Sequence, residues 1–277
     1  MYICLLLSVT LTLSACIQDL KPVPPEIILP DVKVPETTYQ DTATPAPTNT
    51  EPAISEATIP EATIPETTIP EHSDLYIPGI PVEDVITWFN EVALDTEFSY
   101  GGDATLVQKW MTPISYRLDG NATEKDLEVL ESFAAWLNTI EGFPGITLAD
   151  EDNMANLRIH FGDSQMILDI LGDDYVNVDG GVRYWYEANA IYDAAICYRD
   201  DISQYTRNSV ILEEIYNGLG LVQDTALRED SLIWRDYSEP QWLSEVDELL
   251  LKILYHPDIK CGMNAAQCEA VIRDIYY

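Results

Sequence analysis

Residues 213–224 read EEIYNGLGLVQD, and this stretch decides how the folded part of the chain is organised. Ile211 and Ile215 lie one helical turn apart, so residues 208–217 are predicted to form an amphipathic helix with both isoleucines facing the core. Gly218 is expected to end this helix, and Gly220 to lie in the turn that follows. The stretch therefore predicts a polar helix end followed at once by a tight turn.

Helix and strand patterns alternate on both sides of this stretch. Two capping boxes, Thr123 with Asp126 and Ser244 with Asp247, are expected to begin helices. Because the alternation lacks a regular strand–helix–strand repeat, the sequence predicts the α+β class with a mixed β-sheet and C-terminal helices. The remaining predicted elements are helices at 82–94, from Thr123 to before Gly142, at 244–255 and from 264, and strands at 114–118, 155–161 and 191–198.

The charge balance excludes several classes of protein. The 277 residues carry 48 acidic and 14 basic side chains, a formal net charge of −34. A nucleic-acid partner is excluded, because phosphate neutralisation needs a basic surface. The only long apolar run, 2–15, is shorter than the roughly 20 residues that span a bilayer. Of the three histidines, His72 lies in a proline-rich stretch, which leaves His160 and His256 and excludes a three-histidine metal site.

The N-terminus has the pattern of an export signal. Residues 1–15 form an apolar segment that ends in small residues. Leu13-Ser14-Ala15-Cys16 resembles the lipobox of bacterial lipoproteins, which implies that Cys16 is acylated and that the mature protein is extracytoplasmic, anchored to a membrane of the cell envelope by its N-terminal lipid. The alternative is an ordinary secretory signal that happens to contain a cysteine.

Residues 16–78 are predicted to be a disordered acidic stalk rich in proline and threonine. They contain the pentapeptide repeat EATIP, EATIP, ETTIP at 56–70. Such sequence cannot bury enough apolar surface to offset the entropy of ordering, and it extends as a semi-rigid spacer. Residues 79–277 are then expected to form one folded domain.

The cysteines of the exported domain are Cys197, Cys261 and Cys268. Cys261 and Cys268 flank a short loop, and export favours oxidation, so a disulfide between them is predicted. Cys197 lies in an apolar strand and is expected to be a buried thiol.

EEIYNGLGLVQD also resembles the metzincin zinc-peptidase signature HExxHxxGxxH with every histidine replaced. In that family the histidines bind zinc and the glutamate is the general base. The resemblance assigns the degenerate ligand positions to Glu213, Asn217 and Gln223, and the base position to Glu214. It implies a zincin-like sheet, with the strand at 155–161 as its edge-like strand, and a signature helix.

The stretch from about 82 to 276 more closely resembles a bacterial lipoprotein family, domain of unknown function 2927. The segments that carry this resemblance are TWFNEVAL at 87–94, KWMTPISYRL at 109–118, EEIYNGLGLVQD at 213–224 and LYHPDIKCGM at 254–263. The resemblance implies a zincin-like fold, and it brings no established activity with it.

The expected function is therefore that of a catalytically inactive pseudo-peptidase that binds a peptide or an envelope protein, with no cofactor. Zinc prefers imidazole and thiolate ligands, and these are missing from the signature. One alternative is a metal-dependent peptidase whose zinc or calcium is held by Glu213, Glu214 and Asp224, with His160 or His256 recruited. The other is a purely structural envelope domain. The acidic stretch 173–181 is expected to be a solvated turn rather than a calcium loop.

Overall fold

The computed structural model describes residues 73–94, 106–150 and 155–277. The predicted signal, nearly all of the predicted stalk and the predicted lipid-bearing Cys16 lie outside the described residues. The described part is an α+β domain with a mostly parallel mixed sheet, as predicted. None of its helices is long and apolar enough to cross a membrane.

The sheet is built on three parallel strands, of which β4 (Leu157–Gly162) is the middle one. It pairs with β2 (Ile114–Gly120) on one side and with β6 (Ala190–Arg199) on the other. A short β3 (Ile146–Leu148) extends the sheet beyond β2, and β1 (Lys109–Trp110) joins the start of β6. At the far edge, β5 (Gly180–Glu187) runs antiparallel to β6.

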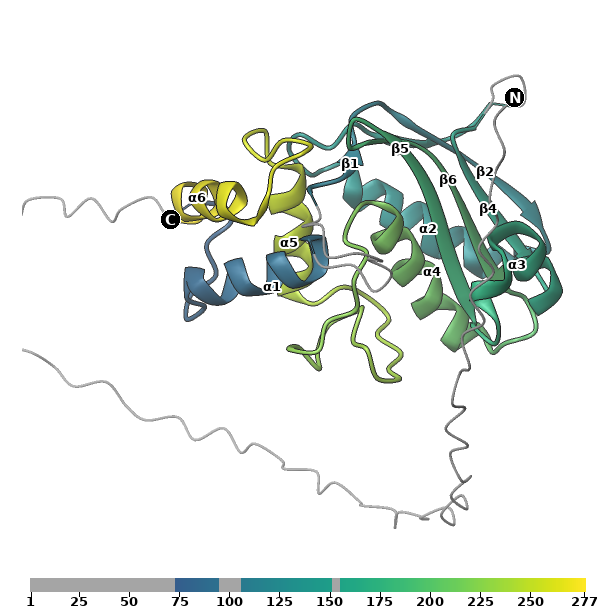
Figure 1. The fold of residues 1–277 in the computed structure, drawn as a ribbon. Coiled ribbons are helices and arrows are strands. Elements are labelled where there is room, and N and C mark those ends of the chain that lie inside the picture. The colour runs from purple at the N-terminus through teal and green to yellow at the C-terminus, as the bar shows by residue number, and fades with distance from the viewer. Residues whose placement is uncertain (1–72, 95–105, 151–154) are drawn as a thin grey trace, which may run out of the picture. The chain divides into compact units, whose positions relative to one another are not determined.

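Helices cover both faces of the sheet (Figure 1). Ala194, Ile196 and Tyr198 of β6 join the main core, whereas Ala195 and Cys197 point to the other face and pack with α3. This alternation explains why β6 is apolar along almost its whole length. The six described helices are α1 (Val82–Leu94), α2 (Glu124–Leu137), α3 (Ser164–Leu171), α4 (Gln204–Gly218), α5 (Glu245–Tyr255) and α6 (Ala265–Ile275), with one 3-10 turn at Asp173–Tyr175.

The helix caps read from the sequence are confirmed. Thr123 and Ser244 each form the predicted capping box with the aspartate three residues later, and Asn264 caps α6. The predicted end of the signature helix was wrong by one residue: Gly218 is the last helical residue, and Gly220 takes the positive φ of 117°. A Cβ at Gly220 would lie 2.1 Å from the backbone oxygen of Gln108, so this turn requires glycine.

The prediction that the strand at 155–161 is edge-like was wrong. It forms β4, which is paired on both sides. The edge strand that lies against α4 is β5. The polar residues Arg158 and His160 suggested a solvent-facing side, but both are half-buried. Arg158 is 2.9 Å from Asp193, and His160 is 3.5 Å from Asp119. The predicted turn at 173–181 likewise runs into β5 at its last two glycines.

The folded part begins before residue 79. Leu75, Tyr76 and Ile77 pack against the main core. The hydroxyl of Tyr276 accepts a hydrogen bond from the backbone N–H of Ile77 at 3.3 Å and reaches the carbonyl of Ile80 at 2.9 Å. The start of the described chain is therefore joined to its C-terminal helix.

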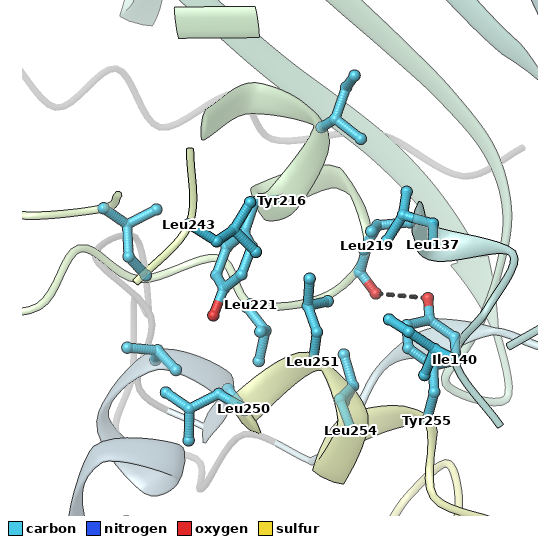
Figure 2. Close-up of a cluster of buried hydrophobic side chains, with 14 of the residues drawn as sticks. Leu137, Ile140, Tyr216, Leu219, Leu221, Leu243, Leu250, Leu251, Leu254 and Tyr255 are labelled. Atoms are coloured by element: carbon cyan, nitrogen blue, oxygen red, sulfur yellow. Dashed lines mark hydrogen bonds between the residues drawn. The ribbon is translucent and has the colours of Figure 1, made fainter. Parts of the chain in front are cut away.

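The C-terminal end of α4 is set into the core formed with α5 (Figure 2). The hydroxyl of Tyr255 donates a hydrogen bond to the backbone carbonyl of Leu219 at 2.9 Å. The indole N–H of Trp110 donates one to the backbone carbonyl of Gly218, also at 2.9 Å. The last carbonyls of a helix lack partners within it. These side chains supply partners and fix where the helix ends.

The segment 219–243, between α4 and α5, is held by the buried carboxylate of Asp247. This carboxylate accepts hydrogen bonds from the Ser231 hydroxyl at 2.7 Å and from the Leu232 backbone N–H at 2.8 Å, and it forms an ion pair with the buried Arg228. One helix-capping residue therefore also shapes the turn beneath α4.

Asp247→Ala should lower the free energy of unfolding by about 3–5 kcal/mol, because it leaves the Arg228 charge buried without its partner. Urea unfolding of the full chain measures the loss. Glu245→Ala, which removes an exposed carboxylate from the same helical turn, is the matched control and should cost below about 1 kcal/mol. Equal losses for the two variants would contradict the role given to Asp247.

Candidate functional site

A cleft of about 1190 Å³ opens between β5, α4 and the segment 219–243. Three separate parts of the chain supply its walls, so no single motif contains the site. The lining residues are 179–184 and Tyr186 from β5 and its approach, Thr206, Ser209, Val210, Glu213, Glu214 and Asn217 from α4, Val222, Asp224, Leu232 and 234–239 from the following segment, and Gln108, Asp174, Tyr175, Asn177 and Val178.

The wall contributed by α4 is a polar stripe on one face of the helix. Ser209, Glu213 and Asn217 recur at four-residue steps, and Glu214 lies beside them. The start of α4 is fixed by the buried ion pair in which Arg207 Nε donates to Asp126 of α2 at 2.8 Å. The polar stripe cannot turn away from the cleft without breaking this pair.

β5 passes very close to α4. A Cβ at Gly180 would lie 2.4 Å from Cγ1 of Val210 and 3.1 Å from Oε1 of Glu214. Any side chain at Gly180 would push the strand and helix apart, so this position requires glycine for space rather than for backbone freedom. The glycine places the strand directly over the Glu214 carboxyl.

The two glutamates of the stripe hold their protons unusually strongly. Burial raises the pKa of Glu214 well above its usual value of 4.5, and the nearby Glu213 and Asp224 raise it further. Burial and then Asp224 and Asp179 raise the pKa of Glu213 to about 8. Neither carboxyl has a hydrogen-bond or salt-bridge partner among the described residues. Near neutral pH the pair is therefore mainly protonated.

Two further acceptors at the cleft lack partners. Oδ1 of Asn217 and Oγ of Ser209 are buried and make no hydrogen bond with the described residues. Asn217 is 9% exposed and Ser209 is 2% exposed, so bulk water does not form hydrogen bonds with either of these buried atoms. Buried polar atoms without partners mark places where a bound group would complete the structure.

The structure brings together part of the set of residues predicted from the signature. Glu213, Glu214, Asn217 and Asp224 all line the cleft. Gln223 does not: its backbone N–H donates to Val92 O at 3.2 Å, and its amide to Asp224 O at 3.4 Å. The segment after Gly220 bonds to α1 at this point, so the residue one position later faces the cleft instead.

His160 and His256 do not reach the cleft either. His160 lies on β4 beside Asp119, and His256 caps the C-terminus of α5, where its Nδ1 accepts from the Asp258 backbone N–H at 3.2 Å. Recruitment of a histidine to the carboxyl cluster, which the metal-dependent alternative requires, therefore has no support in the described geometry.

The carboxyl cluster does not fit a zinc ion. It offers oxygen donors alone, whereas zinc sites in proteins are built mainly on imidazole and thiolate. Within residues 73–94, 106–150 and 155–277, no group of three or more His, Cys, Asp or Glu side chains is arranged to hold a metal.

Sequence reasoning missed the β5 wall of the cleft. Val182, Tyr184 and Tyr186 alternate along it as in a strand, and Ala188 and Asn189 form a two-residue turn in which both φ values are positive. Such turns favour hairpins, but their usual sequence signal is Asn-Gly or Asp-Gly rather than Ala-Asn. The alternation of Val182, Tyr184 and Tyr186 could have indicated the strand, but the Ala188-Asn189 turn has no sequence signal that would have indicated the hairpin.

The cysteines lie away from the cleft. Cys197 is buried, as predicted, and burial raises the pKa of its thiol to about 12. Cys261 and Cys268 carry free thiols in the structure, and Cys268 is buried. The disulfide between them stays a prediction for the exported protein.

Fold and cleft together define a class: an α+β domain in which an antiparallel edge strand overlies a helix with buried acidic side chains. The family described as "Protein of unknown function (DUF2927)" matches residues 83–274, and the chain belongs to it. The match spans the described elements from α1 to α6. A comparison with curated proteins gives no match.

Glu213→Gln should stabilise the protein increasingly as pH rises from about 5 to 8. In this range the native Glu213 keeps a proton that the unfolded chain has released, so the free energy of unfolding of the unaltered protein falls with pH and levels off above about 8. Glutamine cannot ionise and escapes this loss. We expect a gain on the order of 1–3 kcal/mol at pH 8.5, measured by urea unfolding.

Glu141→Gln makes the same chemical change at an exposed loop position and is the control. It should give no gain that grows with pH. A pH-independent difference between Glu213→Gln and the unaltered protein would show that the Glu213 carboxyl is not held protonated in the native state.

Proposed function

We propose that this domain is a zincin-like pseudo-peptidase whose cleft binds an extended peptide along β5 without hydrolysing it. The observation that carries the proposal is the position of β5: an antiparallel edge strand that lies directly over the polar stripe of α4. In strand addition, main-chain hydrogen bonds to a sheet edge hold the peptide and neighbouring pockets choose its side chains.

The order of the elements supports the zincin-like part of the proposal. The capped helix α2 precedes the edge strand, β6 leads into the signature helix α4, and the capped helix α5 follows the turn under the cleft. This is the order that the metzincin resemblance implies, with β5 rather than β4 as the edge. Fold likeness by itself does not establish an activity.

The free edge of β5 supports the binding part. β5 is paired with β6 along one side, and no other described strand pairs with it. An unpaired edge presents backbone donors and acceptors to another chain. Val182 and Tyr184 line the cleft, and the Tyr184 hydroxyl donates to Gln108 at 2.9 Å, which fixes one aromatic side chain of this wall.

The state of Glu214 argues against hydrolysis. A general base must be ionised at the working pH to accept a proton, and burial beside Glu213 and Asp224 keeps Glu214 protonated. In the metzincin pattern the same glutamate acts on a water bound to zinc, and the zinc ligands are replaced here. The retained glutamate therefore lacks the two conditions that its catalytic role requires.

The sequence of the N-terminus adds a location to this proposal. Acylation at Cys16 would anchor the chain to a membrane of the cell envelope, with the part of the predicted stalk that precedes Leu75 as a spacer. The bound peptide would then be an extended segment of an envelope protein. The lipobox resemblance of Leu13-Ser14-Ala15-Cys16 supports this part of the proposal.

The full chain should retain a subset of peptides from a pool of random, unstructured decapeptides, and mass spectrometry of the eluate identifies them. Each retained peptide is then made in two N-methylated forms, with methyl groups on odd or on even residues. Because alternate peptide N–H groups face the sheet edge in strand addition, one form should lose binding at least about tenfold and the other should keep it.

Three outcomes would overturn this proposal. The first is equal binding of both N-methylated forms, and the second is that no peptide is retained beyond the level of a blank support. The third is cleavage of unfolded casein by the purified chain that Glu214→Gln abolishes. Stoichiometric zinc in the purified chain, counted by elemental mass spectrometry without chelator, would also restore the metal-dependent alternative.

A further inference from the structure

The cleft is strongly acidic for a surface that is expected to hold a peptide. Seven carboxyl side chains line it, against two arginines, Arg183 and Arg235. Arg183 packs over the ring of Tyr175 at 5.9 Å. The arginines do not pair with the deepest carboxyls, since neither Glu213 nor Glu214 has an ion-pair partner among the described residues. Two carboxyls without an ion-pair partner among the described residues therefore lie together on the α4 wall of this acidic cleft.

The acidic stripe is joined by an independent feature, a buried acceptor without a donor. Oδ1 of Asn217 lies one helical turn from Glu213 on the same face of α4, is nine-tenths buried, and has no hydrogen-bond partner in the described structure. Oγ of Ser209, one turn before Glu213, is also unpartnered. Acidic side chains alone would not define a site. The buried amide oxygen of Asn217 beside them has no hydrogen bond, and a ligand with a hydrogen-bond donor would supply one.

The charged groups that affect the pKa of Glu214 among the described residues are acidic. They are Glu213 and Asp224, and the hydroxyl of Tyr198 lies on the α4 side of β6, where it bonds to Ile211 O at 3.2 Å. All of these are neutral or negative in their common forms. Arg183 of β5 also lines the cleft, but it packs over Tyr175 and forms no described ion pair with Glu213 or Glu214. A cation that entered here would meet the acceptors of Glu213, Glu214 and Asn217.

We infer that Glu213, Glu214 and Asn217 form a pocket for the cationic side chain, lysine or arginine, of a peptide bound along β5. The inference rests on the proposed function and adds the chemistry of the ligand to it. An ammonium or guanidinium group can donate several hydrogen bonds to these acceptors. Its positive charge also favours the ionised form of the two adjacent carboxyls.

The same geometry predicts a proton balance. The carboxyls are protonated before binding, because burial and mutual repulsion oppose ionisation. A bound cation favours the ionised form, so a proton leaves the pair as the cationic side chain enters and goes to the buffer. Binding of a basic side chain should therefore strengthen as pH rises towards 8, since fewer protons compete for the site.

The first experiment compares three peptides of one sequence with the full chain, using a peptide retained in the pool experiment. They carry lysine, arginine or the uncharged isostere norleucine at one position, and calorimetry measures their affinities between pH 5.5 and 8.5. At pH 8.5 we expect lysine or arginine to bind about tenfold more tightly than norleucine, a difference of about 1.4 kcal/mol. This preference should shrink at pH 5.5.

Glu214→Gln should reduce the preference for the cation, measured as the ratio of the lysine-peptide affinity to the norleucine-peptide affinity, to below about threefold. Gln has nearly the shape of Glu, so the variant removes the charge and keeps the packing. Glu141→Gln, at an exposed position outside the cleft, is the matched control and should keep the full preference.

A second experiment does not depend on peptide capture. The side-chain carboxyls of glutamate are labelled with ¹³C in the full chain and titrated by NMR, with n-butylammonium chloride or with sodium chloride at equal ionic strength. n-Butylammonium, which mimics a lysine side chain, should lower the pKa of the carboxyls that Glu213→Gln and Glu214→Gln assign. Sodium should leave them unchanged.

The outcomes separate the two proposals. If the three peptides bind equally through the β5 edge, peptide binding stands and the cationic pocket is wrong. If no peptide binds but n-butylammonium shifts the two carboxyls, the pocket stands and strand addition is wrong. A titration that n-butylammonium and sodium affect alike overturns the pocket, whatever the peptides do.

Discussion

The contact between β5 and α4 at Gly180 is the constraint on which the site depends. A side chain at Gly180 would collide with Val210 and with Glu214, so the strand can lie over the helix only because this residue has none. The contact excludes water from the Glu214 carboxyl and brings an open sheet edge to the same place. Because Gly180 has no side chain, β5 can bury the Glu214 carboxyl and form one wall of the cleft.

Burying two adjacent glutamates opposes folding, and the rest of the domain offsets that cost. The Arg207–Asp126 ion pair fixes the start of α4 to α2, and the Asp247 cluster fixes the segment that follows its end. Both anchors are buried pairs with several hydrogen bonds, the kind that is strongly destabilising to break. Residues of the stripe are held between these two anchors and cannot relax into solvent. Strain kept at a site by firm surroundings is common where proteins bind or react.

Local chemistry made much of the fold predictable. The capping boxes at Thr123 and Ser244 and the run of apolar residues in β6 are signals within a few neighbouring residues, and the structure has each of them in place. Apart from the one-residue error at the end of α4, the main error concerns pairing between distant segments. The metzincin resemblance implied that the strand at 155–161 is edge-like, yet it is paired on both sides, and its Arg158 forms an ion pair with Asp193 of β6. Its place in the sheet depends on β2 and β6, which local pattern does not reveal.

The candidate site divides in the same way. By itself, the sequence determined that Glu213, Glu214 and Asn217 share one face of a helix that ends before a glycine turn, because helical periodicity and turn chemistry are local. Only the tertiary structure decided that β5 covers this face and that Asp224 rather than Gln223 turns towards it. The same packing keeps the carboxyls protonated. These features come from the approach of segments far apart in the chain, and burial and charge repulsion, which set the pKa of Glu214, exist only once those segments have packed together.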